Sequence, residues 1–460
     1  MKKILSAILF CAVATAATAQ TLNNGITLPN IWPPQYEEPT VRQEMPVPYL
    51  KNKPAVLPIN NGRQLFVDSF LISSTNLRSI YHAPNFYKGN PVLEPTEKWE
   101  NTTEGAPYAA PFSDGIWYDE KEGIFKMWYL AGAGTMHKQS NQTFYTCYAE
   151  SKDGKNWKKV NLDIVPGTNI VDTCDRDAAT IWLDRNEKDP SRRWKLFNIE
   201  RRPTDKRWQI ILKYSADGRK WSRGVAQSGD VYDRSTAFYN PFTNRWALSL
   251  RWSTPVSSRS RAYAENEDPE LLVSLTHRVR KDAVDRNLHF WFAPDDKELR
   301  HPKYPEVEPG IYNFDAIAYE SIMIGQYAAW CGPENNICKR DGIQKRNVIE
   351  LGYSRDGFHF ARPSHKPFMD VNETEDAWNW GNMQSINGTP LIVGDSLYFY
   401  SSGRRLNKIM WDSYTSTGLA VLRRDGFVSM HADKKEGYLT TEKLSFDGKY
   451  FFVNADVKGK

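Results

Sequence analysis

The chain has 460 residues, of which 40% are hydrophobic, 13% aromatic and 25% charged, a composition that excludes wholesale disorder. Its formal charge of +5 falls to +3 when residues 1–19 are removed, because that segment holds two lysines and no acid. So small a surplus, without a block of like charges, gives no support for a nucleic-acid partner or an anionic membrane surface. The 23 Tyr, 21 Phe and 16 Trp suit β-strands and the stacking of sugar rings.

Residues 1–19 predict an export signal that is cleaved from the mature protein. The segment has a basic start, an apolar stretch over 4–14 and the small-residue cleavage site Ala17-Thr18-Ala19. The apolar stretch is too short to span a bilayer, and no other segment approaches the required length. We therefore expect a protein of the bacterial periplasm or the cell exterior, released rather than held by a lipid.

The flanks of the mature chain differ from its middle. Residues 20–60 hold many Pro and Asn and little periodicity, so we expect an extended arm over the surface. The stretch 61–72 is predicted as a strand that helps to close the fold. Residues 433–460 are predicted as a short β extension with strands over 437–441, 444–446 and 450–453. The main domain is predicted to occupy residues 61–432.

A turn motif repeats along the main domain. Ser151-Lys-Asp-Gly-Lys-Asn-Trp157 recurs at Ser215–Trp221 and at Ser354–Phe360, with a reduced copy at Arg424–Phe427. Steps of 64, 139 and 69 residues separate the four turn aspartates, and the middle step is about twice the others. One copy has therefore decayed, somewhere between 265 and 296. The spacing predicts five units of 64 to 70 residues.

Each unit is predicted to be a group of short antiparallel strands. Asp-Gly forms a tight hairpin turn, because Gly supplies the positive φ and Asp can bond back to the backbone. An alternating, aromatic-rich run precedes each clear turn, and a strand pair such as 115–119 with 124–129 comes earlier in the unit. Four strands in each of five units predict an all-β protein, a five-bladed β-propeller. The alternative is a β-sandwich or β-solenoid with chance repeats.

Four cysteines remain after removal of the signal. Cys331 and Cys338 enclose a short loop and are predicted to form a disulfide, as an exported protein permits. A bridge between Cys147 and Cys174 is the weaker expectation, because small buried thiols are common in strands. Neither pair has the close spacing of a zinc knuckle, so zinc is not expected.

Carboxylates recur just before the first strands of the units. In a propeller these strand starts surround one end of a central funnel, so their side chains converge. Tyr, Trp and Arg accompany the acids there. In chain order the residues are Glu100, Glu104, Tyr108, Asp172, Asp175, Asp177, Asp230, Asp233, Arg234, Asp315, Glu320, Asp376, Trp378 and Trp380. At any single position the alternative is an Asp that caps its own turn.

Cleavage of a glycosidic bond requires such a set of side chains. One carboxylic acid protonates the leaving oxygen, and a carboxylate on the other face attacks or activates water. Crowding of like charges raises the pKa of one carboxyl group and supplies the acid. Aromatic faces and arginines hold the sugar. The predicted substrate-binding residues are Arg234, Asp315, Trp380, Arg404 and Tyr108.

Several segments between about residues 60 and 455 carry a family resemblance: Leu65–Ile72, His82-Ala-Pro84, Asn90–Leu93, Asp233–Thr236 with Asn240-Pro-Phe242, Tyr319-Glu-Ser321 and Gly418–Phe427. Through these the chain resembles the five-bladed propeller glycoside hydrolases grouped with families 32, 43, 68 and 130. It resembles more closely the uncharacterised bacterial proteins described as family-32-like glycosyl hydrolases. The resemblance implies a propeller fold and, by analogy, glycoside hydrolysis.

Those families place an Asp on each of the first two blades and a Glu on the third. This chain departs from that pattern, since it carries Asp177 at the expected place but Asp233 at the start of the third unit. The resemblance implies a catalytic role for Asp177. We predict Asp177 and Asp233 as base or nucleophile and charge-tuning partner, and Glu320, although in the fourth unit, as the general acid. The first blade has no clear Asp, and Glu104 is the nearest substitute there and the reserve catalytic residue.

A propeller that binds glycan or protein without catalysis is the alternative function. The sequence has no phosphate loop, dinucleotide fingerprint, Ser nucleophile elbow or His-Glu-x-x-His motif, so no cofactor is expected. A calcium ion occurs in some similar propellers, and nothing in this sequence specifies its ligands. Carbohydrate is the expected partner. The sugar, the linkage and the oligomeric state are left open.

Overall fold

The computed structural model describes residues 19–101, 107–132, 144–277, 288–374, 376–407, 409–433 and 436–456. The export signal, apart from Ala19, and the predicted substitute acid Glu104 lie outside the described residues. Strands dominate and helices are few and short, as the sequence predicts for an all-β protein. In these ranges no helix is both long and apolar enough to cross a membrane.

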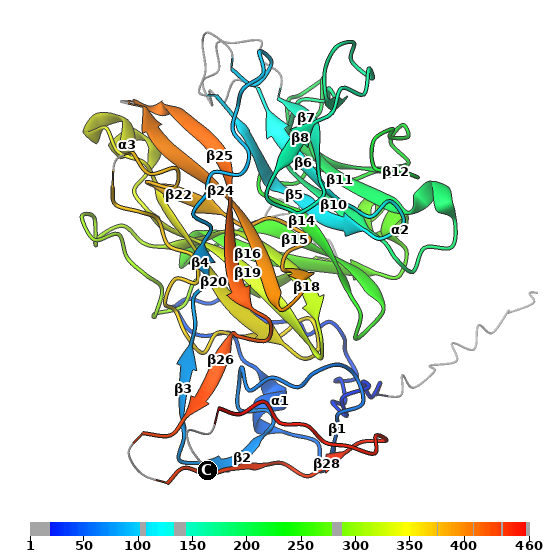
Figure 1. Ribbon diagram of the computed structural model, residues 1–460, viewed down its shortest axis with the longest axis vertical. Coiled ribbons are helices and arrows are strands. Elements are labelled where there is room, and N and C mark those ends of the chain that lie inside the picture. Colours follow the sequence, from blue (N-terminus) through cyan, green and yellow to red (C-terminus); the bar gives the residue numbers. More distant parts are fainter. Residues whose placement is uncertain are drawn as a thin grey trace, which may run out of the picture.

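Three antiparallel sheets follow one another between residues 109 and 292, the first two at the upper right of Figure 1 and the third near its centre. The first contains β5 (Ala109–Asp119), β6 (Ile124–Ala131), β7 (Tyr145–Ser151), β8 (Trp157–Lys159) and β9 (Ile170–Asp172). The second contains β10 (Arg176–Leu183), β11 (Trp194–Arg201), β12 (Trp208–Ser215) and β13 (Ala226–Gln227), with a 3-10 turn at Pro190–Arg192. The third contains β14 (Thr236–Asn240), β15 (Arg245–Thr254), β16 (Ser257–Asn266) and β17 (His289–Phe292), with α2 (Pro269–Ser274) after β16.

The fourth sheet has nine strands in two antiparallel halves. The first half contains β18 (Gly310–Tyr319), β19 (Ile322–Gly332), β20 (Arg346–Ser354) and β21 (Phe360–Ala361), with α3 (Asn335–Asp341) after β19. The second half contains β22 (Asn382–Gln384), β23 (Leu391–Val393), β24 (Ser396–Asn407), β25 (Ile409–Arg423) and β4 (Asn85–Phe86). A single parallel pair, Asn347 with Asn382, joins the halves.

The first strands of the sheets lie side by side in a circle. β5 contacts β10, β10 contacts β14, β14 contacts β18, and β24 and β25 return to β5. A parallel bridge between Ser113 and Ile386 joins the last part of the chain to the first. Residues far apart in sequence therefore meet around one axis.

The repeated turns form as predicted. In each of the three clear copies the Ser hydroxyl accepts the N–H of the turn glycine, at 2.9 Å in the first two and 2.8 Å in the third. Each turn also docks on the preceding sheet or half-sheet. Tyr400 donates to the carbonyl of Gly154, Trp128 to that of Gly218, and Trp291 to that of Phe358. The turns therefore hold neighbouring sheets together.

The two ends of the chain pair with each other below the main sheets (Figure 1). β1 (Leu57–Pro58) pairs with β28 (Leu444–Ser445), β2 (Ile72–Thr75) with β27 (Leu439–Thr441), and β3 (Arg78–Tyr81) with β26 (Val428–His431). A short helix, α1 (Pro48–Lys51), precedes them. β4 then completes the edge of β25. An N-terminal strand thus closes the last half-sheet onto the start of the chain.

Three local predictions are wrong. Residues 61–71 form bends and turns rather than a strand, because Asp68 accepts the N–H of Phe70 and binds the guanidinium of Arg355. Residues 450–453 form no strand. Cys331 and Cys338 are free thiols. Each lies near a different carbonyl, 3.9 Å from that of Ala329 and 3.4 Å from that of Pro333 respectively, within the buried packing around β19 and α3.

Candidate active site

The axis of the circle is filled by a buried polar network. Ser113 on β5 and Ser385 after β22 both donate to Oδ2 of Asp315 on β18, at 3.1 and 2.5 Å. The amide of Asn313 donates to the same oxygen at 3.0 Å. Burial is the largest influence on Asp315 and raises its pKa. The sequence predicts that Asp315 binds the sugar. In the structure its carboxylate instead accepts hydrogen bonds that link the first strands to one another.

Backbone irregularities occur at the strand starts beside this network. The register of β5 shifts between Ala110 and Gly115, that of β10 between Arg176 and Ala179, and that of β18 between Ile311 and Asn313. Bulges re-aim side chains and are common beside active sites. The shift in β10 includes Asp177, and the shift in β18 includes Tyr312.

Asp177 lies on the bulge of β10 and is half-buried. Its Oδ1 accepts the backbone N–H of Arg234 at 2.8 Å. Burial raises the pKa of the Asp177 carboxyl, and the nearby charge of Asp233 raises it further. This environment favours the protonated form more than an ordinary aspartate environment does.

Asp233 has the opposite environment. Its carboxylate binds the guanidinium of Arg251 and, at 3.2 Å, that of Arg259. Burial acts to raise its pKa, but Arg259 and Arg251 outweigh burial and lower the pKa below the ordinary value. The pKa values of these two neighbouring carboxyl groups are therefore shifted in opposite directions. Such opposite shifts are typical of sites in which one carboxyl acts as the acid and the other as the base.

Arg234 is fully buried at the centre of the site and has a left-handed φ of 56°. Its guanidinium lies 3.7 Å from the centre of the Phe112 ring, and its Nη2 donates to Asn313 at 2.7 Å. Nε and Nη1 have no hydrogen-bond partner among the described residues. The structure therefore brings Arg234 beside the carboxyl pair, as predicted.

Tyr312 is a site residue that the sequence analysis missed. Its ring lies 4.4 Å from the guanidinium carbon of Arg259, 5.3 Å from that of Arg234 and 5.8 Å from Nζ of Lys345. Burial acts to raise the pKa of Tyr312, but these three cations lower it below the ordinary value. It lies near the start of the first strand β18, as the predicted residues lie near other first strands, but no motif in the sequence distinguishes it from the other tyrosines of the strands.

Glu320 is not brought to the pair. It occupies the hairpin between β18 and β19, at the other end of β18 from Asn313. Its carboxylate accepts the N–H of Arg63 at 3.0 Å and binds Arg424 at 3.1 Å. These contacts tie the N-terminal segment to the reduced turn copy. These contacts give Glu320 a structural role rather than a catalytic one.

Tyr108 and Arg404 lie near the cluster. Tyr108 is buried and packs edge-on against Phe112, with ring centres 6.4 Å apart. Burial raises its pKa to about 12, while Arg404 and Arg234 act to lower it. Trp380 is half-buried next to the strand that carries Arg404, and no contact of its ring with the carboxyl pair is recorded in the described parts of the chain.

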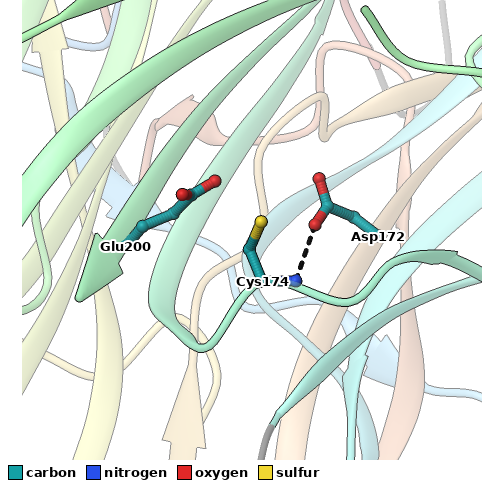
Figure 2. A group of neighbouring side chains, drawn as sticks. All are labelled: Asp172, Cys174 and Glu200. Atoms are coloured by element: carbon teal, nitrogen blue, oxygen red, sulfur yellow. Dashed lines mark hydrogen bonds between the residues drawn. The ribbon is translucent and has the colours of Figure 1, made fainter. Parts of the chain in front are cut away.

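Two clusters have donor atoms close enough for a metal. Figure 2 shows the first, in which Asp172, Cys174 and Glu200 face one another. Nζ of Lys213 already lies 2.5 Å from Asp172, 2.7 Å from Glu200 and 3.4 Å from Sγ of Cys174. The lysine ammonium thus supplies the positive charge that an ion would bring, so this cluster does not fit a resident metal.

The second cluster contains Asp295, Glu298 and His365. Arg362 binds Glu298 through both of its terminal nitrogens, and His365 lies 2.8 Å from Asp295. These carboxylates are also neutralised by side chains. Neither cluster therefore offers the open oxygen ligands that calcium prefers.

A cavity of about 690 Å³ lies elsewhere, over the second half of the nine-stranded sheet. Its lining includes Phe86, Glu94, Asp376, Trp378 and Arg405, and none of the residues of the carboxyl pair. Burial and opposed pKa shifts mark the pair, whereas the acids that line the cavity have ordinary partners: Arg346 binds Asp370 and Glu373, Arg405 lies 3.8 Å from Asp376, and Tyr414 donates to Glu94. We therefore place the candidate active site at the pair.

The chain is similar in structure to several carbohydrate-active enzymes. A fructofuranosidase variant from Schwanniomyces occidentalis is 13% identical, with 79% of this chain and 64% of that one covered and a TM-score of 0.42. A family-130 enzyme described as acting on β-1,2 mannosidic linkages in Candida mannan is 13% identical, with coverages of 77% and 97% and a TM-score of 0.47. A glycosyl hydrolase from Bacteroides ovatus is 14% identical, with coverages of 76% and 97% and a TM-score of 0.46.

The sequence matches no protein-family model, and no curated protein matches it significantly. The chain spans less than two thirds of the fructofuranosidase. These similar structures come from the glycoside hydrolase families that the sequence resembles. At identities of 12–14% and TM-scores below 0.5 they carry no conclusion about activity or substrate. The chemistry of the site must come from its own side chains.

Proposed function

We propose that the protein is an exported glycoside hydrolase that cleaves a glycosidic bond in an oligosaccharide or polysaccharide. Asp177 is the general acid and Asp233 is the base or nucleophile. The observation that carries the proposal is the opposed pKa shift of these two neighbouring carboxyl groups. This assignment replaces Glu320, whose carboxylate is held by Arg63 and Arg424 at the other end of β18.

The fold in this proposal is a five-bladed propeller. The first three sheets are one blade each, and the nine-stranded sheet divides at the single pair between Asn347 and Asn382 into two blades. The circle of contacts from β5 through β10, β14 and β18 back to β5 supports a closed ring. A ring explains how acids 56 residues apart in the chain, Asp177 and Asp233, come to share one site.

In the proposed reaction, the protonated Asp177 carboxyl donates its proton to the leaving oxygen as the bond breaks. Asp233, kept ionised by Arg251 and Arg259, acts from the other side on the anomeric carbon or on a water. The N–H of Arg234 fixes the orientation of the Asp177 carboxyl through the 2.8 Å hydrogen bond. Proton transfer by a positioned acid contributes about 10²–10⁴-fold in rate.

A panel of aryl glycosides and polysaccharides tests the proposal. Asp177→Asn and Asp233→Asn should each lower kcat/KM by about 10²-fold or more on any substrate that the parent cleaves. Glu320→Gln is the matched control, since it makes the same carboxyl-to-amide change away from the pair, and its kcat/KM should equal that of the parent. Circular dichroism and Tm of each variant separate lost chemistry from lost folding.

Equal activity of the parent and both Asp variants would contradict the assignment. Loss of activity in Glu320→Gln with a normal Tm would return the acid role to Glu320. Binding of a glycan without turnover by the parent would favour the alternative, a non-catalytic glycan-binding propeller.

A further inference from the structure

We propose that the sugar bound over the Asp177–Asp233 pair carries a carboxylate, so that the substrate is an acidic glycoside rather than a neutral one. This inference rests on the proposed function, because it names the substrate class of the same site. It follows from the surplus of buried positive charge around the pair.

Cationic side chains outnumber ionised acids at the site. Arg251 and Arg259 bind Asp233, which accounts for one negative charge. Asp177 and Asp315 are the other acids there, and burial raises the pKa of each. With both included the acids number three, which is still fewer than the five cations. The cations that gather there are Arg234, Arg251, Arg259, Arg261 and Lys345.

Several of these cations have donors without a partner. Arg234 is fully buried, and both its Nε and its Nη1 have no hydrogen-bond acceptor among the described residues. The same is true of Nε of Arg251 and Nη1 of the fully buried Arg261. A buried charge without a partner is costly. A ligand with an anionic oxygen would satisfy such donors, and guanidinium groups bind carboxylates through two parallel hydrogen bonds.

Two neighbouring groups respond to the excess positive charge. The cations around Tyr312 lower its pKa although burial acts in the other direction. Burial is the largest cause that lowers the pKa of Arg261 to about 9; Asp315 opposes the shift, and Arg234 and Arg259 add to it. The effect of the cations on Tyr312, and that of Arg234 and Arg259 on Arg261, have the direction expected near surplus positive charge.

The reaction itself gives a reason for an acidic substrate. Glycoside cleavage passes through a transition state in which the sugar ring resembles an oxocarbenium ion. A pocket with surplus positive charge disfavours that cation on a neutral sugar. A carboxylate on the sugar would neutralise Arg234 and its neighbours and remove the penalty. Inorganic phosphate could pair with the same cations, and the experiment below distinguishes it.

The test compares 4-nitrophenyl glucosides and galactosides with the uronides that differ only at C6, in both anomeric forms. For the cleaved configuration, kcat/KM should be at least about tenfold higher for the uronide at low salt, and the ratio should fall as salt is added. Lys345→Met should lower this ratio several-fold. Lys121→Met is the matched control, because it removes the same charge from an exposed position on the β5–β6 hairpin, and it should leave the ratio unchanged.

A second readout does not depend on turnover. Glucuronate should raise the Tm of Asp177→Asn, and glucose at the same concentration should not. Equal or better cleavage of neutral glycosides, with no preferential stabilisation by glucuronate, would overturn the acidic substrate while leaving the hydrolase intact. Acceleration by millimolar phosphate with a glycosyl phosphate product would also overturn it. Preferential stabilisation by glucuronate without cleavage of any glycoside would support the acidic ligand and contradict the hydrolase.

Discussion

Oδ1 of Asp177 accepts the backbone N–H of Arg234 at 2.8 Å, which places the Asp177 carboxyl next to the residue that follows Asp233. The two acids therefore influence each other's protonation, yet only Asp233 is bound by Arg251 and Arg259. From this asymmetry we derive the roles of acid and base.

The leaving group should separate those two roles. Asp177→Asn should retain most of its kcat on a dinitrophenyl glycoside, because such a leaving group departs without protonation, and should lose about 10²-fold or more on an alkyl glycoside. Asp233→Asn should lose activity on both substrates. Initial rates on the two substrates measure this, and equal losses of Asp177→Asn on both would contradict its role as the acid.

The buried ion pair between Asp68 and Arg355 should be important for stability. Both side chains are 2% exposed, and Nη2 of Arg355 lies 2.9 Å from Oδ1 of Asp68. Asp68→Asn leaves the guanidinium buried without a counter-charge, so urea unfolding should show a loss of about 3–5 kcal/mol. Asp433→Asn, in an exposed pair with Arg78, is the control and should cost under about 1 kcal/mol. A similar small loss for Asp68→Asn would show that the pair is dispensable.

The docking of a repeated turn on its neighbour can be measured at Gly218. This glycine has a φ of +76°, and a Cβ there would lie 2.5 Å from Cζ2 of the buried Trp128. Gly167 has a similar φ of +73° and open space around it. Gly167→Ala should cost about 1–2 kcal/mol from backbone strain alone. Gly218→Ala should cost about 1–3 kcal/mol more from overpacking, and equal losses would mean that the turn is not tightly docked.

Glu350 should make stability depend on pH. Burial raises the pKa of Glu350 to about 7, with Arg362 opposing and Glu298 adding to the shift. The unfolded chain releases this proton near its ordinary pKa of about 4.3, so between about pH 4.3 and 7 the folded state binds more protons. Stability should therefore fall as pH rises through that window, by at most about 1.4 kcal/mol per pH unit for this group.

Urea unfolding of the parent and of Glu350→Gln at several pH values from 4.5 to 7.5 tests this contribution. Below about pH 7 the unfolding free energy of the parent should fall more steeply with rising pH than that of Glu350→Gln. Above about pH 7.5 the two slopes should be equal. Glu120→Gln, at an exposed hairpin, should keep the slope of the parent. Identical slopes in the parent and in Glu350→Gln would show that Glu350 has an ordinary pKa.

Local patterns predicted most of the strands. Alternation and the Ser-x-Asp-Gly turns depend on neighbours in sequence, so β5 and β6 include the strand pair 115–119 with 124–129 that the sequence predicts. The sequence singles out Asp177, Asp233 and Arg234 because each lies shortly before or at the start of a first strand, and the structure places the three close together. Glu320 was misassigned because sequence does not show which end of β18 faces the axis. Tyr312 and Lys345 were missed because they meet each other and Arg259 only through the tertiary fold.

The protonation of the two carboxyl groups is the central claim, and ¹³C NMR titration of aspartate-labelled protein measures it directly. Resonances are assigned by their loss in Asp177→Asn and Asp233→Asn. The Asp177 carboxyl should titrate above the ordinary value of about 3.9, and the Asp233 carboxyl below it. Removing Asp233 should lower the pKa of Asp177. The reverse order, or two ordinary and independent titrations, would contradict the assignment of acid and base.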